Sequence, residues 1–151
     1  WINIVACTMA KNSTGMNCMS AIEFADTNVI VYAVGKESTK QAIARRIVAD
    51  GDTVSAQVVN ETVNVLLRKQ GTALAIAHEI AESLLDLADV MPVNEQTIRK
   101  AIQISKRYGF SHWDSLIVAA ALQADCTVLY SEDMQHGQII DDRLTITNPF
   151  L

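Results

Sequence analysis

The sequence is poor in residues that interrupt or cross-link a chain. It has only two prolines, Pro92 and Pro149, and so contains no proline-rich linker between domains. Its three cysteines, Cys7, Cys18 and Cys126, are odd in number and form no CxxC motif. This excludes a disulfide framework and a cysteine-based zinc site, and it suits a reducing cytosol. Cys126 is expected to be a small buried residue just before a strand.

Long hydrophobic runs are also missing. No apolar run reaches the roughly 18 residues that a membrane-spanning helix needs. The first residues do not resemble a signal peptide, since Lys11 is their only charge and no apolar segment follows a basic one. We expect residues 1–18 to be an N-terminal extension of upstream or non-native sequence, with Met19 as a natural start and the domain at 19–151. The alternative is a genuine extension that packs on the domain or on a neighbour.

Positive charge is scarce. The chain has 12 Lys and Arg against 17 Asp and Glu, which gives a net charge of −5. A protein that binds nucleic acid through a large passive surface is usually basic, so the overall sign disfavours that class. It does not disfavour a nuclease, because a metal site needs its own carboxylates and the bound metal reverses the local sign.

What the sequence does have is the composition of one globular domain. It contains 151 residues, half of them hydrophobic and 19% charged, which is enough for one ordinary core. Strand-like and helix-like patterns alternate without any internal repeat, as in βα units around a parallel sheet. The fold class predicted from this pattern is α/β, a three-layer α/β/α sandwich whose central, mostly parallel sheet has about five strands.

The individual elements follow from hydrophobic spacing and from capping residues. Ser38 is expected to cap a first helix and Gly51 to stop it, while Asn94 and Gly109 play the same roles for a later one. A helix that begins after Ser111 is apolar almost all round, so it should be buried centrally. Strands are predicted at 22–25, 53–55, 90–93, 127–130 and 144–146, and helices at 38–49, 56–69, 72–88, 94–108 and 112–124.

Four acidic residues stand where these elements begin or end. Asp26 follows the first strand and Asp133 follows the fourth, and ligands of open α/β sheets collect outside the carboxyl ends of strands. Glu61 and Asp114 lie in the first turns of two helices, and helix N-termini face the same edge in a βα unit. All four acids are therefore expected to converge on one rim.

Clustered carboxylates repel one another, and one of them takes up a proton unless a cation intervenes. Mg²⁺ or Mn²⁺ suits such hard oxygen ligands, and such an ion can activate water against a phosphodiester. Asn28 and Ser131 are expected to orient a carboxylate or a water, although both are also common turn or capping residues. The alternative for the four acids is that they are only helix caps and solvated faces.

At these residues the sequence resembles the PIN-domain ribonucleases, most closely the VapC-type toxins of toxin–antitoxin pairs. The resemblance spans about residues 21–151 and rests on four blocks in order, ADTNVIVYA at 25–33, NETVNVL at 60–66, SHWDSLIVAAAL at 111–122 and LYSEDMQHG at 129–137. The third and fourth blocks are the more specific, and residues 1–18 match none of the family's blocks.

The resemblance implies a three-layer α/β/α fold, Mg²⁺- or Mn²⁺-dependent endoribonuclease activity, homodimers and a cognate antitoxin that covers the site. It places Asp26, Glu61, Asp114 and Asp133 at the family's metal-binding positions, with Asn28 and Ser131 as polar support. A further family acid corresponds loosely to Asp141 or Asp142.

Substrate RNA requires positive charge near the acids. Arg68 and Lys69, two turns beyond Glu61, are candidate RNA contacts, and solvated helix ends are the simpler interpretation. Trp113 is expected to pack rather than to stack on a base, and His112 and His136 to have surface or capping roles. The other basic candidates are Lys36, Arg45, Arg46, Lys106 and Arg107.

Two other function classes remain open from the sequence. A phosphotransfer enzyme of the HAD type also has an Asp after its first strand, but it requires a second Asp where this chain has Asn28, and a lysine shortly before Asp133. A binding module without catalysis would keep the acids only as caps.

Overall fold

The computed structural model describes residues 21–35, 39–49 and 53–151, so the predictions for Ser38, Gly51 and residues 1–18 lie outside it. The described part contains one six-stranded sheet with the order β3-β2-β1-β4-β6-β5. Every neighbouring pair is parallel except β5 with β6. The strands are β1 (Glu23–Ala25), β2 (Thr53–Ser55), β3 (Asp89–Met91), β4 (Val128–Tyr130), β5 (Ile139–Ile140) and β6 (Leu144–Thr147).

The predicted mostly parallel sheet is confirmed, and its five predicted strands are present. The third begins one residue earlier than expected, at Asp89, and ends at Met91 rather than Val93. The sixth strand, β5, was not predicted, because two residues are too few to show an alternating pattern. It forms a short antiparallel pair at one edge of the sheet.

Six helices join and cover the described strands. Their predicted cap residues are confirmed where the structure describes them. Asn94 accepts the Thr97 backbone N–H at 3.1 Å, Gly109 ends the same helix at φ +77°, and Ser111 accepts the Asp114 N–H at 3.1 Å. The helices are α2 (Thr27–Val34), α3 (Thr39–Ala49), α4 (Ala56–Arg68), α5 (Leu74–Leu87), α6 (Glu95–Tyr108) and α7 (His112–Gln123).

Helix α2 is not among the predicted elements. Its run of Val, Ile and Tyr residues favours a strand on local propensity. Asp26 overrides that preference by capping the helix, since its side chain accepts the Thr27 backbone N–H at 2.6 Å. The chain therefore turns from strand into helix at the first of the four acids.

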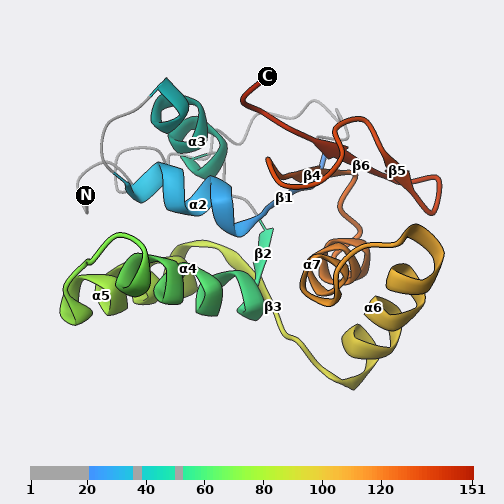
Figure 1. The fold of residues 1–151 in the computed structure, drawn as a ribbon, viewed down its shortest axis with the longest axis horizontal. Coiled ribbons are helices and arrows are strands. Elements are labelled where there is room, and N and C mark those ends of the chain that lie inside the picture. Colours follow the sequence, from blue (N-terminus) through green and yellow to red (C-terminus); the bar gives the residue numbers. More distant parts are fainter. Residues whose placement is uncertain (1–20, 36–38, 50–52) are drawn as a thin grey trace, which may run out of the picture.

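Helices cover both faces of the sheet, as a three-layer sandwich requires. Figure 1 shows α2 and α3 on one side of the strands and α7 and α6 on the other, with the α4–α5 hairpin extending from the β2–β3 end. Helix α7 is buried from Ser115 to Leu122, which confirms its predicted central position. Cys126 is 1% exposed, also as predicted.

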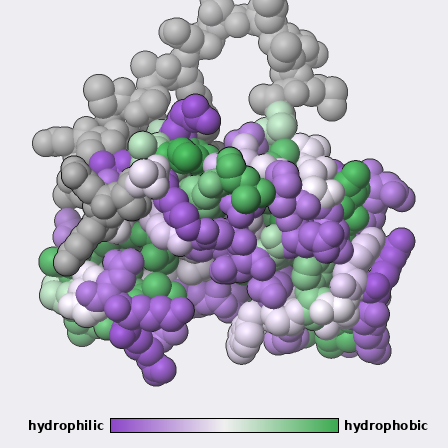
Figure 2. Space-filling view, turned by 45° about the horizontal axis from the view of Figure 1, so that its top comes forward, coloured by the Kyte–Doolittle hydropathy of each residue, from purple (hydrophilic) through white to green (hydrophobic). Residues whose placement is uncertain are grey.

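The face of the domain drawn in Figure 2 has many hydrophilic residues, with separate hydrophobic patches among them. Helix α5 packs on α4 and leaves Leu74, Ile76 and Leu85 more than half exposed. None of the helices in the described ranges is long and apolar enough to cross a membrane.

Candidate active site

The first acid of the site is built into the β1–α2 junction. Asp26 is only 4% exposed, and its Oδ1 accepts the Thr27 N–H at 2.6 Å. Its Oδ2 accepts hydrogen bonds from Ser131 Oγ at 2.6 Å and Asn28 Nδ2 at 3.2 Å. Both oxygens of a buried carboxylate are thus fixed by hydrogen-bond donors.

The second acid is tied to the first by the two predicted supporting residues. Asn28 Nδ2 donates to Asp133 Oδ2 at 3.2 Å as well as to Asp26. Ser131 Oγ donates to Asp26 and accepts the backbone N–H of Asp133 at 3.3 Å. Asn28 and Ser131 therefore bridge the two strand ends by hydrogen bonds, and the orienting role predicted for them stays a prediction.

Glu61 reaches the same region from α4. Thr27 Oγ1 donates to its Oε2 at 2.8 Å, and Gln57 Nε2 donates to its Oε1 at 2.6 Å. Gln57 lies one helical turn before Glu61, and Thr27 follows Asp26 in the chain. The carboxylate is held beside Asp26, although no bond joins the two acids.

Asp114 lies in the first turn of α7, where a negative charge is favourable near the helix N-terminus. Its Oδ2 accepts a hydrogen bond from Ser111 Oγ at 2.7 Å, and its backbone N–H donates to the same hydroxyl. Asp114 therefore takes part in the capping interaction that the alternative interpretation proposes for it. Capping does not remove Asp114 from the site, because Asp114 also lines the cleft described next.

One cleft of about 450 Å³ collects all four acids. They come from four parts of the chain, namely the end of β1, the helices α4 and α7, and the loop after β4. The predicted convergence on one rim is thus present in the structure. The other lining residues are Thr27, Asn28, Val31, Tyr32, Val65, Lys69, Gln70, Ile117 and Glu132.

The cleft is unfavourable for the charge of Asp26. The pKa of Asp26 is raised from 3.8 to about 6, mainly by burial and to a smaller extent by the nearby carboxylates of Asp133 and Glu61. Hydrogen bonds from Ser131 and Thr27 act in the opposite direction. A bound cation would favour the ionised form that burial and like charge disfavour.

The ligand atoms that the cleft offers are of the type that a hard divalent ion binds. Carboxylate and amide oxygens are the ligands that Mg²⁺ and Mn²⁺ prefer. Within residues 21–35, 39–49 and 53–151, no three acidic, His or Cys side chains form a group that could hold an ion as they stand. The carboxylates are instead paired with neighbouring hydroxyl and amide groups.

Comparison with known proteins agrees with this geometry. The sequence matches the PIN domain family over residues 24–139, which is most of the chain and includes all four acids. The chain belongs to the PIN-domain family. This membership overturns the alternative of a HAD-type phosphotransfer enzyme. No curated protein matches the chain by sequence.

Solved structures share the fold of this PIN domain. The Mycobacterium tuberculosis toxin VapC20, described as cleaving the sarcin-ricin loop, is 21% identical with a TM-score of 0.63, over 74% of this chain and 89% of that one. FitAcB from Neisseria gonorrhoeae is 23% identical with a TM-score of 0.63, over 85% and 98%. A toxin–antitoxin complex from Klebsiella pneumoniae is 14% identical with a TM-score of 0.62, over 86% and 98%.

Sequence reasoning missed one acid of the PIN domain cleft. Glu132 lines it beside Asp133 and accepts hydrogen bonds from Lys40 Nζ and from Tyr32 Oη, the latter at 2.7 Å. The Lys40 bond is the main reason why the pKa of Glu132 is below its usual value. Its position before Asp133 was visible in the sequence, but its partners lie more than 90 residues away.

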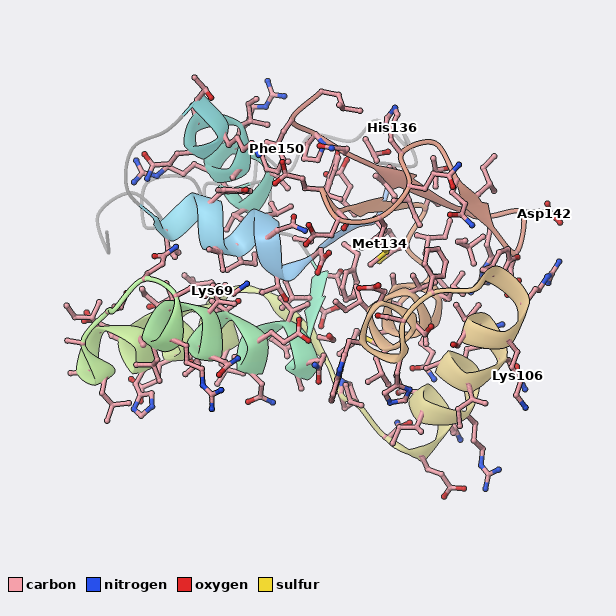
Figure 3. The ribbon with its side chains drawn as sticks, viewed as in Figure 1. Lys69, Lys106, Met134, His136, Asp142 and Phe150 are labelled. Atoms are coloured by element: carbon pink, nitrogen blue, oxygen red, sulfur yellow. The ribbon has the colours of Figure 1, made fainter. Side chains whose placement is uncertain are left out.

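Of the two predicted RNA contacts, the structure places one in the cleft and the other outside it. Lys69 lines the cleft, and Figure 3 shows its side chain between α2 and α4. Arg68 is exposed and does not line the cleft. Arg45 donates to the Ala33 carbonyl at 3.1 Å. Lys36 lies outside the described residues, and Arg46 and Lys106 are not among the cleft residues.

The candidate fifth family acids lie elsewhere. Asp141 accepts from Lys100 at 2.7 Å, Arg107 at 2.9 Å and Tyr108 at 3.0 Å. Figure 3 shows Asp142 on the opposite side of the molecule from Lys69. Asp141 therefore joins the β5–β6 turn to α6.

The aromatic and imidazole candidates also have defined surroundings. The prediction that Trp113 packs in the protein is wrong, since it is 58% exposed, and its ring meets that of His112 in a T-shaped arrangement with centroids 5.5 Å apart. His136 Nδ1 accepts the Asn148 N–H at 3.1 Å, in line with the expected capping role. Trp113 was misjudged because it precedes a buried helix but lies on its first, uncovered turn.

Proposed function

We propose that this PIN domain is a metal-dependent endoribonuclease, the toxin of a toxin–antitoxin pair. The observation that carries the proposal is the cleft in which Asp26, Glu61, Asp114 and Asp133 meet from four separate elements. Two of these acids are bridged by the Asn28 amide, and the most buried one has a raised pKa. Caps and solvated faces alone do not explain why a buried carboxylate is placed beside other acids.

In this proposal Asp26, Asp114 and Asp133 hold Mg²⁺ or Mn²⁺. Such an ion would polarise an RNA phosphodiester and lower the pKa of water for in-line attack. Asn28 and Ser131 keep the carboxylates of Asp26 and Asp133 directed at the cleft. Glu61, whose two oxygens are held by Thr27 and Gln57, acts either as a further ligand or as the base that accepts a proton from water.

Lys69 is the proposed contact to the RNA backbone. Among the described residues that line the cleft it is the basic one, and it can neutralise a phosphate next to the scissile one. Arg68, on the outer surface of the same helix end, is assigned only a distant electrostatic role.

The proposed partners are a cognate antitoxin and a second copy of the chain, with the cytoplasm as the site of action. Support comes from the shared fold with VapC20 and with a toxin–antitoxin complex. The exposed Leu74, Ile76 and Leu85 on α5 supply apolar surface for such a contact.

The experiment that tests the activity compares RNA cleavage by the wild type in Mg²⁺, in Mn²⁺ and in EDTA, beside Mg²⁺ titration by calorimetry. The proposal expects cleavage that EDTA abolishes and that Asp26→Asn lacks. Absence of both metal binding and cleavage would favour a binding module that keeps the acids as caps.

A further inference from the structure

We propose that Lys40 and Tyr32 are positioning residues of the site, which act through Glu132 to hold the 131–133 loop against Asp26. The inference rests on the proposed function, because it assigns how one side of the metal site is kept in place. The loop follows β4 and belongs to neither a helix nor a strand. The Ser131 backbone N–H ties the start of the loop to the Thr147 carbonyl at 3.0 Å, and the hydrogen bonds of Glu132 and Asp133 described below involve side chains.

Glu132 is held from outside the loop through both carboxylate oxygens. Lys40 Nζ, from α3, donates to Oε1, and Tyr32 Oη, from α2, donates to Oε2 at 2.7 Å. Lys40 Nζ also donates to Tyr32 Oη at 3.3 Å, which closes a three-membered group. The Lys40 ammonium already compensates the charge of this carboxylate, so Glu132 serves as an anchor rather than as a fifth metal ligand.

The same loop is fixed to the acids on its other side. The Glu132 backbone N–H donates to Asn28 Oδ1 at 3.3 Å, and Asn28 Nδ2 donates to Asp26 and Asp133 at 3.2 Å each. Ser131 Oγ donates to Asp26 at 2.6 Å. The loop is thus held between the acids on one side and the Lys40–Tyr32 pair on the other.

Aromatic rings partly shield the anchor from water. The Tyr32 and Phe150 rings meet edge to face with centroids 5.1 Å apart, and Lys40 Nζ lies 4.8 Å from the first centroid and 5.4 Å from the second. Figure 3 shows Phe150 beside α3, near the end of the chain. Shielding strengthens an ion pair that would contribute little in open solvent, and it restricts where Glu132 can lie.

The chain contains a matched control for this ion pair. Lys100–Asp141 joins two other segments, and its lysine side chain has the same exposed fraction as that of Lys40, 35%. Lys40→Met and Lys100→Met therefore each remove one ion pair of a lysine with the same exposure. Asp141 keeps its ion pair with Arg107, and only the Lys40 pair is connected to the cleft. Circular dichroism and thermal unfolding check that both variants fold.

Calorimetry with Mn²⁺ and single-turnover cleavage at saturating Mn²⁺ distinguish a positioning role from general stabilisation. We expect Lys40→Met to weaken Mn²⁺ binding and cleavage by about tenfold or more, as loss of groups that orient metal ligands does. Lys100→Met should leave both at the wild-type value. Tyr32→Phe keeps the ring on Phe150, and its Mn²⁺ affinity and cleavage rate should lie between those of the two lysine variants. In a protein that already carries Glu132→Gln, the further change Lys40→Met should have little effect on either quantity.

Hydrogen exchange at the Glu132 and Asp133 amides measures loop holding in the same variants, whether or not RNA is cleaved. Faster exchange in Lys40→Met than in Lys100→Met is expected. Equal exchange, Mn²⁺ affinity and cleavage in these two variants would overturn the positioning role. A wild type without Mn²⁺ binding or cleavage overturns the proposed function instead, and the exchange rates then still decide whether Lys40 holds the loop.

Discussion

Ser131 donates a 2.6 Å hydrogen bond to Asp26 across 105 residues of sequence. The bond is possible because β1 and β4 are parallel neighbours, with Ala25 opposite Tyr130 in register. Asp26 and Ser131 each follow one residue of that pair, so the sheet itself brings the two together. The first consequence of this arrangement is a buried carboxylate whose charge the protein alone does not compensate.

Asp26→Asn should stabilise the metal-free protein at neutral pH. The pKa of Asp26 is about 6 in the folded protein and 3.8 as its ordinary value, so ionisation costs roughly 3 kcal/mol of stability above pH 6. Well below the ordinary value of 3.8 the residue is protonated in both states, and the advantage of the variant should disappear. Urea unfolding in EDTA at about pH 2.5 and at about pH 7.5 measures the difference.

The control for this prediction is Mn²⁺. A saturating concentration should raise the stability of the wild type and leave that of Asp26→Asn nearly unchanged. A variant that is less stable than the wild type at pH 7.5 in EDTA would contradict the account of Asp26.

Glu61→Gln separates the two roles proposed for Glu61. A base that accepts a proton contributes about 100-fold or more to the rate, with little effect on metal affinity. A metal ligand contributes both to the cleavage rate and to the metal affinity. We expect lost cleavage in either case, and Mn²⁺ calorimetry decides between the roles, with Gln57→Ala as a control that loosens the carboxylate without removing it.

Lys69→Met should weaken RNA binding more than Arg68→Met does. Both residues are exposed, but of the two only Lys69 lines the cleft, so the pair differs in position and not in charge. Removing one phosphate contact should reduce the slope of log affinity against log salt by about 0.7 for single-stranded RNA. Equal losses for the two variants, measured with a non-cleaving Asp114→Asn background, would argue against a direct contact by Lys69.

Asp141→Asn should reduce stability without changing the metal site. Lys100 is the first cause that holds the pKa of Asp141 below its usual value, followed by Tyr108 and Arg107. The ionised Asp141 carboxylate therefore makes its full contribution to the free energy of unfolding at neutral pH. That contribution is lost as the pH falls through the lowered pKa. At pH 7 the variant should lose about 1 kcal/mol in free energy of unfolding, a small value because the Asp141 carboxylate is partly exposed. The substitution should not strain the backbone, since Asn tolerates the local φ of +47°. Thermal unfolding measures the loss of stability, and Mn²⁺ calorimetry checks that the metal site is unchanged.

Much of the fold could be predicted from hydrophobic spacing and capping chemistry. Asn94, Gly109 and Ser111 mark helix ends through local interactions, and local interactions are readable from sequence. Helix α2 could not be predicted in this way, since its β-branched residues favour a strand and only the cap at Asp26 and burial against the sheet make it helical.

The candidate site also has features that follow from the sequence and features that depend on long-range packing. The ends of parallel strands and the starts of helices lie on one edge, so the convergence of Asp26 and Asp133 follows from topology. The contact of Lys40 with Glu132 spans 92 residues and depends on how α3 packs, which no spacing reveals. Trp113 was misplaced for a related reason, because burial of α7 says nothing about its first turn.

The most direct test of the account is Mn²⁺-dependent cleavage of RNA by the wild type and by Asp114→Asn, purified in the same way. Asp114 lines the cleft but is exposed enough for the change to preserve the fold, and a contaminating nuclease would act equally in both samples. We predict cleavage by the wild type that EDTA abolishes and no cleavage by the variant. Equal cleavage by the two proteins, or none by the wild type with Mn²⁺, would contradict a ribonuclease site built on these four acids.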